Sequence, residues 1–186
     1  CKGLLSLDGL TELSDAAAES LSKYDGSYIS FDSLTELSDA AAESLSNFKG
    51  YLYLNGLAEL NESVAEALSK CECSELNLEG ITKLNDQAAE SLSKFRGDSL
   101  SLGLVSVSDA AAESLGGFNG NDLGLSELTH LNEKASASLS KFRGDKLWLC
   151  SLTTVSDEVA QNLGGFSGDI SFGNEDLRLQ VAKYRA

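Results

Sequence analysis

The sequence predicts an α/β solenoid, with a parallel β-sheet on the concave face and one short α-helix per repeat on the convex face. The same line of residues begins at Leu5, begins again at Ile29, and occurs seven times at steps of 23 or 24 residues. Each copy opens with alternating apolar and polar residues, which is typical of a half-buried strand, and then changes to helical spacing. Such a period is typical of arrays in which each unit buries its apolar face against its neighbours.

The predicted strands share one pattern, in which two apolar residues flank a third residue. Both apolar side chains then point to the same face of the sheet, and the middle side chain points to the other. This pattern occupies residues 5–7, 29–31, 52–54, 76–78, 100–102, 123–125, 147–149 and 170–172.

A helix start follows each of the first seven strands. One position is always Ser or Asn, whose side chains accept hydrogen bonds from the first free amides of a helix. The next position is always acidic, which suits the positive end of the helix dipole. Counted from this cap, positions 3, 4 and 7 form the predicted buried stripe, and position 10 is aromatic except at Cys71. The predicted caps are Ser14, Ser38, Asn61, Asn85, Ser108, Asn132 and Ser156.

Strand, turn, cap, helix and turn within about two dozen residues resemble a leucine-rich repeat. The nearer match is the cysteine-containing class, patterned roughly L-x-L-x-x-C-x-x-I-T-D, which residues 5–15 fit as Leu-x-Leu-x-x-Leu-x-x-Leu-Ser-Asp. The compact Ser-Asp-x-Ala-Ala repeats also resemble those of bacteria such as planctomycetes. The family's inward Asn or Cys is absent, and an apolar row takes its place: Leu10, Leu34, Leu57, Ile81, Leu104, Leu128 and Leu152.

This resemblance divides the chain into an array and a capping segment. Residues 1–168 hold seven repeats, and residues 169–186 hold an eighth strand followed by an amphipathic segment that covers the last unit. The repeats span about 5–26, 29–50, 52–73, 76–97, 100–120, 123–144 and 147–168.

Composition and charge exclude several classes of partner. The formal net charge is −15 at pH 7, from 29 acidic and 14 basic residues. Phosphate binding needs clusters of Lys and Arg, so we expect no nucleic-acid partner. No stretch approaches the about 20 consecutive apolar residues of a transmembrane helix, so we expect no membrane span.

The sequence contains no recognisable catalytic motif. The single histidine, His130, would have to serve any Ser-His-acid triad, and it occupies a turn at the edge of the convex side. No glycine-rich phosphate loop follows a strand, because the Gly-Gly pairs at 116–117 and 164–165 end helices instead. We therefore expect a protein that is not an enzyme and takes no cofactor.

The four cysteines predict neither a metal site nor a disulfide. Cys71 and Cys73 lack the second pair of ligands that a zinc site needs, and Cys71 is expected as a buried core thiol. Cys1 and Cys150 lie six strands apart, or about 29 Å along the sheet, which no disulfide spans. Cys1 reads either as a boundary left by proteolysis or as the mature end of a bacterial lipoprotein. The second interpretation favours an extracellular or cell-surface location, and a cytoplasmic one stays open.

The outward side chains of the sheet carry the functional signal. They form columns with one row per repeat, about 4.8 Å apart, on an otherwise monotonous surface. Tyrosines gather near one end beside acidic residues, and the only tryptophan stands with a lysine near the other. Exposed aromatics among polar groups are typical of interface anchors, although tyrosine also favours strands in general. The predicted binding residues are Tyr28, Tyr51, Tyr53, Glu75, Asn77, Lys146 and Trp148.

Two functions fit this pattern. The first is a non-enzymatic recognition or scaffold module that binds a protein or peptide on the concave sheet. The alternative is a structural subunit that assembles end to end into an oligomer or filament. The first strand begins close to Cys1, which leaves its edge without a cap, and the last segment is locally basic at Arg178, Lys183 and Arg185.

A third hypothesis is cation binding by an acidic ladder. Asp8, Asp32 and Glu79 follow their strands at equivalent positions, with Asn55 as a neutral ligand between them. Adjacent carboxylates repel one another, and a divalent cation that prefers oxygen ligands would relieve the repulsion. The spacing is wide for shared ligation, so we assign no metal site.

Overall fold

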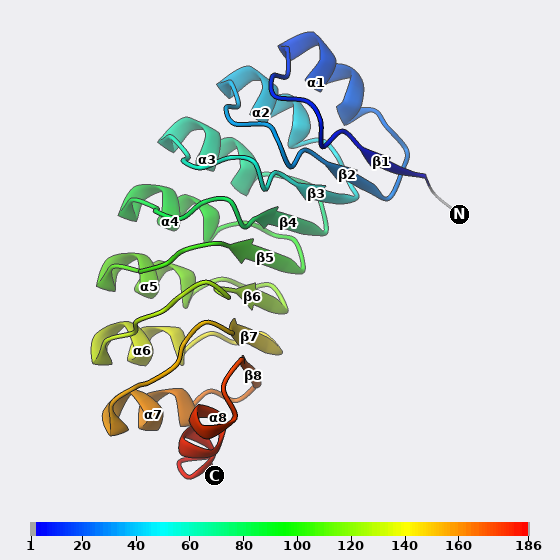
Figure 1. The fold of residues 1–186 in the computed structure, drawn as a ribbon. Coiled ribbons are helices and arrows are strands. Elements are labelled where there is room, and N and C mark those ends of the chain that lie inside the picture. Colours follow the sequence, from blue (N-terminus) through cyan, green and yellow to red (C-terminus); the bar gives the residue numbers. More distant parts are fainter. Residues whose placement is uncertain (1–2, 186) are drawn as a thin grey trace.

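The computed structural model describes residues 3–185 and shows a curved array of strand–helix units (Figure 1). Within these residues eight strands form one parallel sheet in sequence order, and a helix follows each strand. The sheet lines the inner side of the arc and the helices its outer side (Figure 1). The predicted α/β solenoid is confirmed.

Each repeat contributes one short strand to the sheet. They are β1 (Leu4–Ser6), β2 (Tyr28–Ser30), β3 (Tyr51–Tyr53), β4 (Glu75–Leu78), β5 (Ser99–Leu102), β6 (Asp122–Gly124), β7 (Lys146–Leu149) and β8 (Asp169–Phe172). The helices are α1 (Asp15–Ser22), α2 (Asp39–Leu45), α3 (Glu62–Ser69), α4 (Asp86–Leu92), α5 (Asp109–Leu115), α6 (Glu133–Leu139), α7 (Asp157–Gly164) and α8 (Glu175–Ala182). No helix in residues 3–185 has the length and apolar character needed to cross a membrane.

Equivalent residues of successive repeats lie side by side in the sheet. Leu5 pairs with Ile29, and Ile29 pairs with Leu52, so the apolar residues form one continuous buried row. Ile29, Leu52 and Leu76 are completely buried. This register also confirms the predicted outward columns, because Ser30 pairs with Tyr53 and Tyr53 with Asn77.

All seven predicted caps are confirmed. Each cap side chain accepts a hydrogen bond from the amide three residues later, as when Asn85 Oδ1 accepts from Ala88 N at 2.7 Å. The aspartate that follows a cap also bonds to the next repeat, since Asp109 Oδ1 accepts from Asn132 Nδ2 at 2.9 Å. Three further aspartates accept such a bond from the following repeat, namely Asp15, Asp39 and Asp86, and Asp157 accepts one from Gln180 of the capping helix. These bonds tie successive repeats together along the edge where the helices begin.

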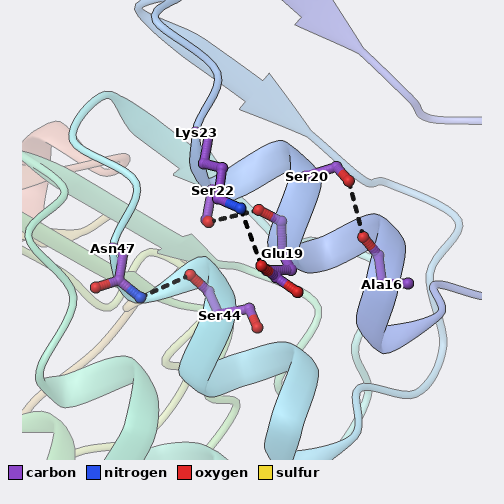
Figure 2. Close-up of polar contacts among 7 residues, drawn as sticks. All are labelled: Ala16, Glu19, Ser20, Ser22, Lys23, Ser44 and Asn47. Carbon is purple, nitrogen blue, oxygen red and sulfur yellow. Dashed lines mark hydrogen bonds and ion pairs between the residues drawn. The ribbon is translucent and has the colours of Figure 1, made fainter.

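The outer helix faces carry solvent-exposed polar pairs within single helices. Figure 2 shows Lys23 Nζ beside Glu19 Oε1 at 2.9 Å and Ser20 Oγ donating to the Ala16 carbonyl oxygen at 2.9 Å. The same i,i+4 pair recurs at Glu66 with Lys70. Exposed pairs of this kind contribute a few tenths of a kcal/mol each, as expected of a solvated helix face.

The apolar core is continuous but thins at the first repeat. Position 7 after the cap holds a completely buried leucine in the later repeats, including Leu68 and Leu92, whereas Leu21 is partly exposed. The predicted apolar row behaves alike, because Leu10 is 41% exposed while its later equivalents are at most 1% exposed. The prediction that every member lies inside is therefore wrong for Leu10, Leu21 and Ala17, all of the first repeat. In the described chain the first repeat has a neighbour on one side only.

A spine of stacked rings runs through the core beneath the helices. Phe118 stacks on Phe95 with ring centroids 6.2 Å apart, and the stack continues through Phe142 to Phe166. Each ring covers the glycine two residues later. A Cβ atom on Gly97 would lie 2.2 Å from Phe95 Cζ, which real Cβ contacts do not allow. The aromatic residue and the glycine therefore act as a pair, because the ring occupies the space that a side chain would need.

The third repeat replaces both members of this pair by cysteine. Cys71 and Cys73 are joined by a disulfide, with their Cα atoms 5.2 Å apart, and both are buried. The predictions of no intramolecular disulfide and of a core thiol at Cys71 are wrong. The distance argument concerned only Cys1 and Cys150, whereas a separation of two residues falls within disulfide reach. Cys1 lies outside the described residues, and Cys150 is a free, partly exposed cysteine, as predicted.

The last helix covers the end of the array. Helix α8 packs against α7 and β8 and buries Leu177 and Val181 (Figure 1). The Arg185 guanidinium donates to the carbonyl oxygen of Gly168. The cover is partial, because Ile170 and Phe172 of β8 stay partly exposed.

Candidate functional site

The concave face carries the predicted binding residues in two groups. Tyr28, Tyr51 and Glu75 lie in one column, which runs across β2, β3 and β4. Tyr53 lies in the neighbouring column, between Ser30 and Asn77. Strand alternation sends these side chains to the concave side, because the residues between them belong to the buried row.

Tyr28, Tyr53 and Glu75 are linked by side-chain contacts and, with their strand neighbour Tyr51, are called here the tyrosine cluster. The rings of Tyr28 and Tyr53 meet edge to face, with centroids 4.8 Å apart and planes at 69°. The Tyr53 hydroxyl donates to Glu75 Oε1 at 2.5 Å. Tyr51 is 46% exposed and lies in the same column, between Tyr28 and Glu75. The structure therefore brings four of the predicted residues together.

Negative charge surrounds the tyrosine cluster. Burial, followed by the hydrogen bond to Glu75 and the charges of Glu75 and Glu79, raises the pKa of Tyr53 well above its usual range. The phenol consequently stays neutral and keeps its proton directed at the carboxylate. The Tyr53 hydroxyl is therefore already bonded within the protein, and the ring contacts that of Tyr28.

Asn77 has a supporting position at the edge of the cluster. Its side chain is only 8% exposed, and its Oδ1 accepts from the Glu79 amide at 3.1 Å. Asn55 Oδ1 accepts from the same amide at 3.2 Å. Asn77 therefore holds the backbone where β4 ends and offers little surface to a partner.

The acidic ladder is held by hydrogen bonds from the protein itself. Asp8 accepts from the hydroxyls of Ser30 and Ser6 and, at 3.4 Å, from the amide of Asp32. The serine hydrogen bonds, that of Ser30 first, lower the pKa of Asp8. Asp32 Oδ1 in turn accepts from Asn55 Nδ2 at 3.1 Å. Across residues 3–185 no three His, Cys, Asp or Glu side chains converge as a metal site would require, so we do not pursue the cation hypothesis.

The second group lies on β7. Lys146 Nζ stands 3.8 Å from the centroid of the Trp148 ring, a cation–π contact within the protein. Trp148 pairs with Gly124 of β6, whose Cα faces Ser101 so closely that a Cβ would lie 2.6 Å from the serine Oγ. Between the tyrosine cluster and Trp148 the same column of the sheet therefore holds the small residues Ser101 and Gly124.

Several hollows lie between successive repeats rather than on the concave face. One of about 390 Å³ is lined by Leu37 and Leu60, in the loops between strands and helices. Another of about 380 Å³ lies at the opposite edge and is lined by Tyr24, Lys49 and Tyr51. This second hollow continues the tyrosine cluster around the edge of the sheet. The sequence pattern missed it, because Tyr24 was considered only as the aromatic residue at position 10 after the cap, and Lys49 was not considered.

The remaining polar candidate, His130, lies in the loop before α6. Its Nδ1 is 2.9 Å from the hydroxyl oxygen of Thr129, and the side chain is exposed. It belongs to the edge where the helices begin, and it is not among the residues of either concave group.

Comparison with known proteins adds no family. No protein-family model matches the chain, and no curated protein matches it. The assignment of function therefore depends on the repeat pattern and on the two groups of the concave face.

Proposed function

We propose that this chain is a leucine-rich-repeat protein that recognises another protein or a peptide on its concave sheet, without catalysis and without a cofactor. The observation that carries the proposal is the placement of three of the five tyrosines and the only tryptophan on that one face. Large aromatic side chains at a surface provide much contact area at low entropic cost, and interfaces are enriched in them.

The spacing of the two groups favours a macromolecular partner. Tyr53 on β3 and Trp148 on β7 lie four strands apart in the sheet. At about 4.8 Å per strand this separation is about 19 Å, which exceeds the reach of a typical small metabolite. The small residues Ser101 and Gly124 leave room for the main chain of a partner to cross between the tyrosine cluster and Trp148.

The double variant Tyr53→Ala, Trp148→Ala tests this proposal. We expect a partner captured from an extract of the source organism by the unaltered protein to be lost by the double variant. The melting temperature should fall by no more than about 4 °C, because both side chains are partly exposed. Tyr184→Ala, in an exposed residue beyond α8, is the matched control and should retain the partner. Equal recovery of the same partner by the double variant would show that the concave face is not the binding surface.

The alternative proposal is end-to-end assembly of identical chains. Apolar side chains are exposed at both ends of the array, with Leu4 76% and Leu10 41% exposed at the first repeat and Leu179 52% exposed on α8. Because such contacts join two different surfaces, they generate rings or open filaments rather than closed pairs.

Sedimentation velocity over a wide range of protein concentration and salt tests the assembly proposal. We expect the sedimentation coefficient to rise with concentration, and Leu179→Ser to abolish the rise because it removes apolar contact area from one end only. A single monomeric species under every condition would rule out end-to-end assembly.

A further inference from the structure

Four carboxylates in and near the tyrosine cluster have no cationic partner among the described residues. Asp8, Asp32, Glu75 and Glu79 lie on or beside the first four strands, and none pairs with a Lys or Arg within residues 3–185. Seven other carboxylates of the described residues do pair with Lys or Arg; Glu90, for example, lies 2.9 Å from Lys94. Because unpaired carboxylates at one surface create a negative potential, this end of the concave face attracts cations.

The aromatic surface at the same place has the matching chemistry. Tyr51 exposes nearly half of its area, and Tyr53 is partly exposed beside it, with its hydroxyl bonded to Glu75. The faces of aromatic rings are negative, and they attract ammonium and guanidinium groups that lie within about 6 Å of the ring centroid. A carboxylate offers about four acceptor positions, so Glu75 can accept hydrogen bonds beyond the one from Tyr53.

The protein already makes this kind of contact at the other anchor. Lys146 lies over the ring of Trp148, so one indole face is occupied by a cation of the same chain. Within residues 3–185 no Lys or Arg lies over the rings of the tyrosine cluster, and Glu75 and Glu79 add negative charge there. The two groups are therefore unequal, and the tyrosine cluster is the one that can accept a positive group from outside.

We propose that the tyrosine cluster is a subsite for a cationic side chain, Lys or Arg, of the polypeptide that the concave face binds. This inference rests on the proposed function and specifies the partner's chemistry. The rings of Tyr51 and Tyr53 contact the cation, and Glu75 accepts hydrogen bonds from it. An extended chain advances about 3.3 Å per residue, so the residue that reaches Trp148 lies about six positions from the cationic one.

Nuclear magnetic resonance with ¹³C-labelled tyrosine rings tests the subsite without knowledge of the natural partner. The probe is N-acetyl-arginine amide, titrated in the millimolar range at constant ionic strength. We expect saturable shifts of the Tyr51 and Tyr53 ring resonances and none at Tyr184. Glu75→Gln and Tyr51→Leu should each weaken binding about two- to fivefold, as expected for an exposed cation–π contact. Tyr51→Phe should bind normally because it keeps the ring.

Two controls separate specific recognition from general attraction. N-acetyl-norleucine amide has an apolar side chain without the charge and should leave the rings unshifted. Equal shifts with norleucine, equal shifts at Tyr184, or no shift at Tyr51 and Tyr53 would each overturn the cationic subsite. The result is independent of the partner-capture experiment, because a concave interface that takes another side chain would lose its partner in the double variant yet fail this titration.

Discussion

Leu92→Ala should lower the free energy of unfolding by about 2–5 kcal/mol, because it opens a cavity between repeats that pack on both sides. Leu92 is completely buried at the end of α4, and α4 packs against both α3 and α5. In a linear array each repeat is stabilised mainly by its nearest neighbours, so damage in the middle weakens two interfaces at once. Urea unfolding followed by far-ultraviolet circular dichroism measures the loss.

Leu163→Ala provides the comparison near the end of the array. Leu163 is also completely buried, but α7 has a full repeat on one side and the single helix α8 on the other. The Leu92 variant should therefore show the larger loss of cooperativity. Ser101→Ala, on the concave surface, should cost less than about 0.5 kcal/mol. Identical unfolding curves for the two leucine variants would contradict nearest-neighbour coupling in this protein.

The sequence predicted two kinds of feature: those set within one repeat, and those in which equivalent residues of successive repeats pair with each other. Cap residues such as Asn85 and the pairing of Tyr53 with Asn77 follow from one repeat and its period, because identical spacing forces equivalent residues to stack. Diagonal contacts do not follow from the period. The hydrogen bond from Tyr53 to Glu75 joins two neighbouring columns. It depends on side-chain rotamers, which the repeat pattern does not specify.

Burial at the first repeat and bonding between repeats were missed for different reasons. Leu10 was expected inside because its later equivalents are inside, yet burial depends on a neighbour, and the described array leaves this repeat one neighbour short. Asp109 was assigned only to the helix dipole. Its bond to Asn132 becomes evident only when the helix starts of two repeats are placed side by side.

The disulfide was missed because the two cysteines were tested only as metal ligands and against distant cysteines. Comparison across repeats shows that Cys71 and Cys73 occupy the aromatic and glycine positions of the ring spine. In the other six repeats a Cβ on that glycine would lie 2.1 to 2.7 Å from a ring atom, so the ring and a second side chain exclude each other. In five of them the Cβ would also lie 2.5 to 2.7 Å from a backbone carbonyl oxygen of the preceding repeat. Loss of the ring at Cys71 permits a side chain at Cys73, and the two sulfur atoms fill the vacated space.

This exclusion predicts strong coupling between two substitutions. Cys71→Phe alone should cost about 1–3 kcal/mol, because it breaks the disulfide and the new ring collides with the Cys73 side chain. Cys73→Gly alone removes the disulfide and leaves space unfilled, so it should also destabilise the protein. The double variant restores the aromatic–glycine pair and extends the stacked rings between Phe48 and Phe95. We therefore expect its stability to lie within about 1 kcal/mol of the unaltered protein, with a coupling free energy of about 2 kcal/mol or more.

Urea unfolding of the four proteins, with and without a phosphine reductant, measures this coupling. The disulfide closes a very short loop and contributes less through chain entropy than a long-range disulfide does, so packing should dominate its effect. The unaltered protein should lose stability on reduction, whereas the double variant lacks both cysteines and should be indifferent to the reductant. Additive costs in the two single variants would mean that Cys71 and Cys73 do not replace the ring and its glycine as a unit. The Phe-x-Gly repeats would then owe their glycine to the backbone turn alone.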